Sequence, residues 1–228
     1  MTTSRHSFFA ALIAAAILGA TDAQAVSLAP GAIEPLFGTT AAARPELEGV
    51  VVIPDTLRPF TINLSGGGTI TGTIQDRILR SDDDGTLDFY FRIVNDASST
   101  GAINFVQRDG FADFTTDVDW RVDDLGSVAP SWAFREPVFE SQITFLFANP
   151  IDPGEESRFF FVKTNATDYW EIADGVLAGT GSDMKGNAFV FDTFEPIAPI
   201  PLPAAVWLFG SGLVGLTAVA RRKRRTRS

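Results

Sequence analysis

The sequence predicts an all-β protein, with an antiparallel β-sandwich or jelly-roll-like body between two short helical end segments. Apolar and polar side chains alternate in several short runs, and clusters of Gly, Pro, Asn and Asp separate these runs. We find no amphipathic helix of ten residues between 49 and 195. The chain has 20 phenylalanines and no cysteine, so an aromatic core rather than a disulfide framework has to stabilise the sheets.

Residues 1–25 have the pattern of a secretory signal peptide, which forms the first helical segment. Arg5 precedes an apolar run over 8–18, and Ala23 and Ala25 are the small residues of an Ala-Gln-Ala site. The run is apolar on every side, unlike a surface helix, and it is too short to span a bilayer. We expect signal peptidase to cut after Ala25 and the body to be exported.

The body follows a lead-in over residues 26–48, which we expect to be loose because prolines interrupt it and no period is visible. The region 49–195 has the period of two that is typical of strands. Its strand-like runs cover residues 50–53, 60–64, 70–74, 87–93, 103–106, 119–122, 143–147, 158–163 and 188–191. Phe159, Phe160 and Phe161 are consecutive in one run, so both faces of that strand should be covered.

The last segment, residues 196–228, predicts a membrane span with a basic end. No charged residue occurs over 200–220, and a helix over 203–220 would be about 27 Å long, close to the hydrocarbon thickness of a bilayer. The cations that follow directly are Arg221, Arg222, Lys223, Arg224 and Arg225. By the positive-inside rule they predict that the end 221–228 is cytoplasmic and that the body lies outside the inner membrane, in the periplasm.

The segment before the span has the composition of a sorting signal. Its residues are Pro201, Leu202, Pro203, Ala204 and Ala205. A short proline motif, a glycine-bearing span and a basic cluster follow one another, and this order resembles the PEP-CTERM sorting domain of Gram-negative bacteria. The family is named after a Pro-Glu-Pro tripeptide, and this tail resembles the Pro-Leu-Pro-Ala variant of that signal.

The resemblance covers only the tail, and it implies how the protein is handled. An exosortase in the inner membrane would read the proline motif 201–205 and the basic residues 221–225, so exosortase and signal peptidase are the expected enzyme partners. Many family members come from bacteria that make biofilm, which adds extracellular polysaccharide as an expected partner. The alternative is an ordinary single-span anchor without processing, which the span and the basic end alone would also produce.

Charge and composition exclude several classes of function. Residues 26–220 contain 11 basic and 27 acidic residues, a net charge of −16, which would repel the phosphates of a nucleic acid. There is no cysteine, and the only histidine is His6 in the predicted signal peptide. Zinc–thiolate sites, cysteine nucleophiles and Ser-His-Asp relays are therefore excluded from the exported body.

Acidic loops are the remaining candidates for a ligand site. Asp82, Asp83 and Asp84 lie in a predicted turn and offer the hard oxygen ligands that calcium prefers. Their spacing is not that of an EF-hand, which requires acids at alternate positions. The sequence therefore suggests calcium as the only cofactor, and the alternative is a solvated turn without a metal.

Together these observations favour a non-enzymatic protein of the cell envelope or extracellular matrix, linked to exopolysaccharide through the resemblance of its tail. The alternative is a carbohydrate-active domain on a membrane anchor, either a calcium-dependent glycan-binding module or a glycosidase that uses two carboxylates. Trp120, Trp132 and Trp170 are the candidate sugar platform for that alternative. Most aromatic residues in strands are core residues, which favours the non-enzymatic reading.

Overall fold

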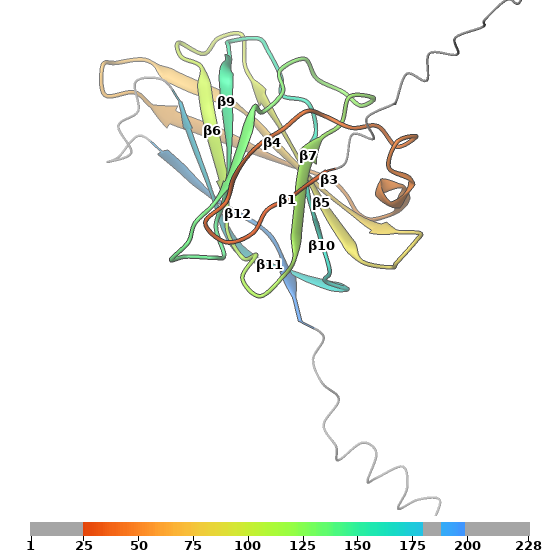
Figure 1. The fold of residues 1–228 in the computed structure, drawn as a ribbon. Coiled ribbons are helices and arrows are strands. Elements are labelled where there is room, and N and C mark those ends of the chain that lie inside the picture. The colour runs from red at the N-terminus through yellow and green to blue at the C-terminus, as the bar shows by residue number, and fades with distance from the viewer. Residues whose placement is uncertain (1–24, 180–187, 199–228) are drawn as a thin grey trace, which may run out of the picture.

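The computed structural model describes residues 25–179 and 188–198 (Figure 1). Within them the chain forms two antiparallel sheets of six strands each, packed face to face as a β-sandwich, which confirms the all-β fold. The strands are β1 (Val26–Ser27), β2 (Ile33–Pro35), β3 (Gly49–Asn63), β4 (Thr69–Ser81), β5 (Leu87–Asn95), β6 (Ile103–Arg108), β7 (Thr116–Trp120), β8 (Trp132–Arg135), β9 (Ile143–Ile151), β10 (Phe160–Thr164), β11 (Asp168–Gly179) and β12 (Ala188–Ile197). A short 3-10 helix, Pro45–Leu47, precedes β3.

The two sheets exchange strands along the chain. Sheet A has the order β1-β7-β10-β5-β4-β3, and sheet B has the order β12-β11-β6-β9-β8-β2. Consecutive strands pair in β3–β4–β5 of sheet A and in β8–β9 and β11–β12 of sheet B. Along the chain, β6, β7 and β10 each lie in a different sheet from the strand before and the strand after. The core is therefore built from segments that are far apart in the sequence.

Phenylalanine side chains fill the space between the sheets. The ring of Phe160 packs against three others, with centroid distances of 4.6 Å to Phe145, 5.7 Å to Phe91 and 5.9 Å to Phe147. All four side chains are buried. Tilted and edge-on ring pairs at these distances stabilise a core beyond the effect of burial alone, so this cluster joins β5, β9 and β10 across the sandwich.

The run of three phenylalanines, which begins one residue before β10, is covered on both faces, as its sequence predicts. Phe160 belongs to the core between the sheets, whereas Phe159 and Phe161 belong to a second buried cluster with Leu47 and Tyr90. This second cluster lies on the outer face of sheet A, under the helix Pro45–Leu47. The outer face of sheet A is therefore partly closed by the segment that precedes β3.

The lead-in 26–48 packs against the sandwich, which corrects the expectation of a loose segment. β1 pairs with β7, β2 pairs with β8, and the side chains of Leu28, Leu36 and Leu47 are buried. The two strands have only two and three residues. Because each contact is so short, no apolar residue recurs often enough to produce a period in the sequence.

Some strands differ from the predicted runs for physical reasons. β8 has four residues, and β11 has an irregularity after Trp170 that breaks the period of two, so the sequence pattern showed neither strand. The runs 50–53 and 60–64 form one strand, β3, in spite of Pro54 and Pro59. β3 lies at the edge of sheet A, where a proline that cannot donate a hydrogen bond is tolerated.

Candidate functional site

An open groove of about 650 Å³ lies between β3 and β11. Its lining residues are Ile53, Pro54, Thr56, Tyr169, Trp170, Glu171 and Phe194. Trp170 is 57% exposed, whereas Tyr169 packs edge-on against Phe194 with 5.9 Å between the ring centroids. An exposed aromatic ring beside a carboxylate offers both an apolar face and a hydrogen-bond acceptor, which are the groups that fix a polar ligand in a groove.

The carboxylate of this groove, Glu171, is held in an ion pair. Nη2 of Arg58 donates a hydrogen bond to Oε1 of Glu171 at 2.6 Å, and the same guanidinium lies over the Phe194 ring, 5.2 Å from its centroid. A carboxylate oriented in this way accepts hydrogen bonds from a ligand. It is less suited to donate a proton to a leaving group, as a glycosidase acid must.

Ion pairs continue from the groove into the core, because Arg58 also donates to Asp76. Asp76 in turn accepts a hydrogen bond of 2.6 Å from Nη2 of the completely buried Arg108, which lies on the opposite sheet. The Arg108 guanidinium is enclosed by two rings, with its carbon 3.9 Å from the centroid of Phe91 and 4.7 Å from that of Phe191. Burial lowers the pKa of Arg108, and Asp76 opposes this effect. This buried pair links the two sheets beside the groove.

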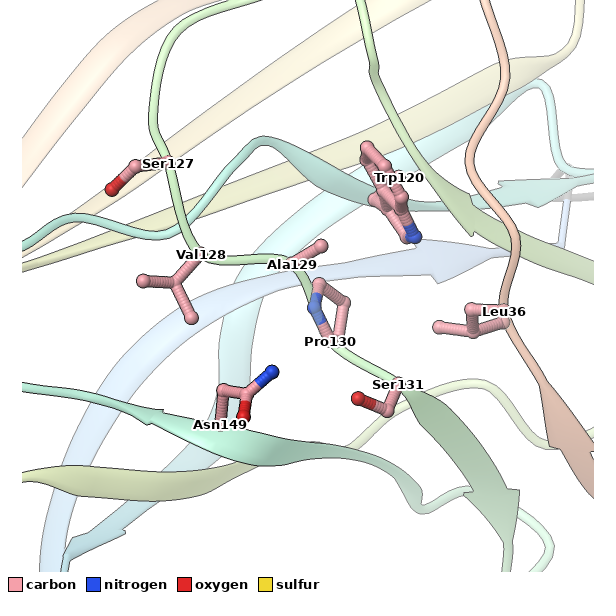
Figure 2. A pocket seen from close by; sticks show the side chains of 8 residues that line it. All are labelled: Leu36, Trp120, Ser127, Val128, Ala129, Pro130, Ser131 and Asn149. Atoms are coloured by element: carbon pink, nitrogen blue, oxygen red, sulfur yellow. The ribbon is translucent and has the colours of Figure 1, made fainter.

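A second pocket, of about 400 Å³, lies beside Trp120 (Figure 2). Its lining residues are Leu36, Trp120, Ser127, Val128, Ala129, Pro130, Ser131 and Asn149. In Figure 2, Pro130 lies between Trp120 on one side and Asn149 on the other. Trp120 belongs to β7 of sheet A and Asn149 to β9 of sheet B, so the pocket is bordered by both sheets.

The indole of Trp120 is fixed by its neighbours. The guanidinium of Arg158 lies over the ring, 5.4 Å from its centroid. Gly38, with a φ of +81°, approaches the ring so closely that a Cβ there would lie 2.5 Å from it. The indole N–H is buried and has no hydrogen-bond partner among the described residues. Trp120 is therefore a packed wall of the pocket rather than an exposed platform.

The structure separates the three tryptophans that the sequence singles out. Trp120 lies in sheet A, whereas Trp132 and Trp170 lie on β8 and β11 of sheet B. Trp132 is 43% exposed and lines neither of the two pockets. The three side chains therefore do not share one surface, and the exposed ones are Trp132 and Trp170.

The predicted calcium turn is organised by hydrogen bonds within the protein. Oδ1 of Asp84 accepts from the N–H and the hydroxyl of Thr86, at 2.9 and 2.6 Å, and Oδ2 accepts from Lys163 at 3.2 Å. Burial opposes ionisation, but these bonds outweigh it and lower the pKa of Asp84 to about 2. Asp82 and Asp83 are exposed. In the part of the chain that the structure describes, no three acidic side chains are grouped as a metal site.

Sequence reasoning missed Asp88, which is completely buried although it alternates with apolar residues as a solvent-facing residue would. Its Oδ1 lies 3.6 Å from Nζ of Lys163, and within residues 25–179 and 188–198 neither carboxylate oxygen has a hydrogen-bond partner. Burial raises the pKa of Asp88 to about 7, although Lys163 partly opposes this effect. The alternating pattern misled because the outer face of sheet A is partly covered by the lead-in.

The predicted targeting residues lie mostly outside the described residues. Ala23 belongs to the undescribed N-terminal segment, and the sorting signal 201–205 and basic residues 221–225 belong to the undescribed C-terminal segment. Ala25 is described, and it packs against the outer cluster of sheet A. The next residue, Val26, is the first residue of β1, so a cut after Ala25 would leave that strand complete.

The described part of the chain has no helix that is long and apolar enough to cross a membrane. The groove at Trp170 is the place where the structure combines an exposed aromatic ring with an oriented carboxylate. No protein-family model matches the chain, and no curated protein matches it.

Proposed function

We propose that this chain is a non-enzymatic protein of the Gram-negative cell envelope or extracellular matrix, sorted by an exosortase. The signal peptide 1–25 directs export, the span 203–220 holds the protein in the inner membrane, and the proline motif 201–205 is read for processing. The observation that carries the proposal is the order of a proline motif, an uncharged span and a basic cluster in the tail. The signals at the two ends support each other, because both predict an extracytoplasmic body.

A non-enzymatic role for the body is supported by the pairing of the carboxylates at and beneath the groove. Glu171 in the groove and Asp76 beneath it are both bonded to Arg58, and the exported chain has no histidine or cysteine for proton transfer or nucleophilic attack. The alternative, a carbohydrate-active domain, is supported by the exposed Trp170. Because the nearby carboxylate is paired, we favour glycan binding over glycoside hydrolysis for that alternative.

Exchange of Pro201 and Pro203 for Ala tests the sorting proposal. Alanine continues a helix, so the double variant should insert in the membrane as the parent does and yet escape processing. An epitope in the open turn at Gly66 and Gly67, where the structure leaves room for an insertion, reports the fate of the body. In a host that carries an exosortase, the variant should remain in the inner membrane at its unprocessed size.

The matched control for this experiment is Pro199→Ala, which changes a proline just outside the motif and should leave processing intact. Fractions of the inner membrane, the outer membrane and the medium are compared by immunoblot. If the double variant and the parent show the same size and the same distribution, the tail is an ordinary anchor and the sorting proposal fails.

A further inference from the structure

The outer face of sheet B carries two rows of side chains that run across all six of its strands. The first row, in strand order from β2 to β12, is Pro35, Trp132, Leu146, Phe105, Ala178 and Ala188. The second row, in the same order, is Ile33, Phe134, Thr144, Gln107, Val176 and Val190. We call these twelve residues the uncharged strip.

The alternation of β6, β8, β9 and β11 places their strip residues on the outer face of sheet B. The residues between the strip positions, such as Ala133 on β8, Phe145 on β9 and Leu177 on β11, are buried in the core between the sheets. Their neighbours along the strand must therefore point to the opposite face. Four members of the strip are well exposed: Ile33 at 60%, Trp132 at 43%, Leu146 at 39% and Val190 at 59%. Ala178 on β11 is buried by its neighbours, and the other seven members are partly exposed.

The strip differs in charge from the rest of the body. It contains no Asp, Glu, Lys or Arg, although residues 26–220 carry a net charge of −16. The next outward positions on β11 and β12 are Asp174 and Asp192, which lie directly opposite each other and are exposed. An anionic partner would be repelled at this border, and no cation on the strip would compensate. The charge pattern therefore selects an uncharged partner.

The size of the strip favours a narrow ligand over a second copy of the chain. Six strands at about 4.8 Å spacing give a length of about 24 Å, and the two rows lie about 7 Å apart. With its side chains the strip covers roughly 300 Å², whereas a stable dimer buries about 800 Å² on each partner. Two acidic bodies would also repel each other. An extended polymer fits this shape. β6 and β9, which supply the middle of the strip, lie side by side in Figure 1.

We propose that the uncharged strip binds a single chain of an uncharged polysaccharide. The C–H-rich faces of sugar rings pack on the exposed ring of Trp132 and on the partly exposed rings of Phe134 and Phe105. The side chains of Thr144 and Gln107 in the middle of the strip hydrogen-bond to sugar hydroxyls. This inference rests on the proposed function, in which the exported body meets extracellular polysaccharide, and deepens it: it assigns the binding surface to the outer face of sheet B and the ligand to the uncharged class.

The test uses the full chain in phosphatidylcholine nanodiscs, with empty nanodiscs as the blank. Binding is measured by biolayer interferometry to the uncharged polymers hydroxyethylcellulose, dextran and galactomannan, and to carboxymethylcellulose as the anionic counterpart of the first. We expect at least one uncharged polymer to bind. Carboxymethylcellulose should bind at least about tenfold more weakly than hydroxyethylcellulose if the latter is the ligand, because charge repulsion of about 1.4 kcal/mol corresponds to that factor.

Matched variants locate the binding surface. Trp132→Ala should weaken binding at least about tenfold, whereas Trp170→Ala, an exposed tryptophan of the same sheet outside the strip, should change it less than about twofold. Val190→Asp adds a charge at an exposed strip position without leaving a cavity and should also weaken binding. Its control, Val50→Asp, alters an equally exposed valine on β3 of sheet A.

Three outcomes would overturn the inference. The first is that none of the uncharged polymers binds, or that carboxymethylcellulose binds as well as hydroxyethylcellulose. The second is that Trp170→Ala weakens binding and Trp132→Ala does not, which would place the ligand in the groove. The third is that the parent is a dimer by sedimentation and Val190→Asp is a monomer, which would assign the strip to a second copy. The proline variants of the tail should bind as the parent does, so failure of the sorting proposal is distinguishable from failure of this one.

Discussion

Asp76→Asn should lower the free energy of unfolding by about 3–5 kcal/mol, because breaking a buried ion pair leaves its partner charge uncompensated. Asp76 is 1% exposed, and its carboxylate accepts a hydrogen bond of 2.6 Å from the completely buried Arg108. The substitution keeps the volume of the side chain and removes only the charge. Denaturant titration followed by tryptophan fluorescence measures the loss.

The matched control is Asp55→Asn on the neighbouring strand. Asp55 is also bonded to an arginine, Arg77, with 2.6 Å between Oδ1 and Nε, but this pair lies at the surface. Pairs of this kind contribute about 1 kcal/mol or less. Equal losses for the two variants would show that the link through Arg108 does not hold the sheets together more strongly than a surface pair does.

We expect the free energy of unfolding of the parent to fall as the pH rises from about 4 to about 7, and we expect Asp88→Asn to abolish this decrease. Burial raises the pKa of Asp88 to about 7 in the folded chain, whereas an aspartate in the unfolded chain has a pKa of about 3.9. Between these values the unfolded chain has released the proton and the folded chain still holds it. Stability therefore falls with rising pH, by up to about 1.4 kcal/mol per pH unit, and levels off above pH 7.

Comparison of the parent with the variant isolates the contribution of Asp88. The neighbouring Asp84 has its pKa lowered to about 2, so its own contribution is present above about pH 4 and is lost only at lower pH, outside this window. Unfolding measured at half-unit steps from pH 4 to pH 8 should give a flatter profile for Asp88→Asn. Parallel profiles would mean that Asp88 is ionised in the folded chain throughout this range.

The fold class could be predicted because inward-facing residues of long strands alternate, as in β5 and β9. The lead-in could not be predicted, because Leu28, Leu36 and Leu47 each make an isolated contact that leaves no period in the sequence. The burial of Asp88 could not be predicted either. Local alternation shows that two faces differ, but it does not show that a segment distant in the sequence covers the polar one.

The candidate surfaces depend on strand neighbours that only the fold provides. Trp132 and Leu146 are directly opposite each other on β8 and β9, but β8 is too short to be visible as a pattern. The uncharged strip also needs the register between β6 and β11, in which Phe105 lies opposite Ala178. The absence of charges at outward positions of β6 and β9 was the signal in the sequence that could have drawn attention to this face.

The central claim is that the chain is exported and sorted through its tail. The most direct test is to measure the intact mass of the protein recovered from a host that carries an exosortase. The predicted product begins at Val26 and lacks the C-terminal segment 221–228 with its basic cluster. When Pro201 and Pro203 are replaced by Ala, the product should retain residues 221–228 and be heavier than the parent's product by their mass. Recovery of the parent as a single species that extends from Met1 to Ser228 would contradict both the export and the sorting of this protein.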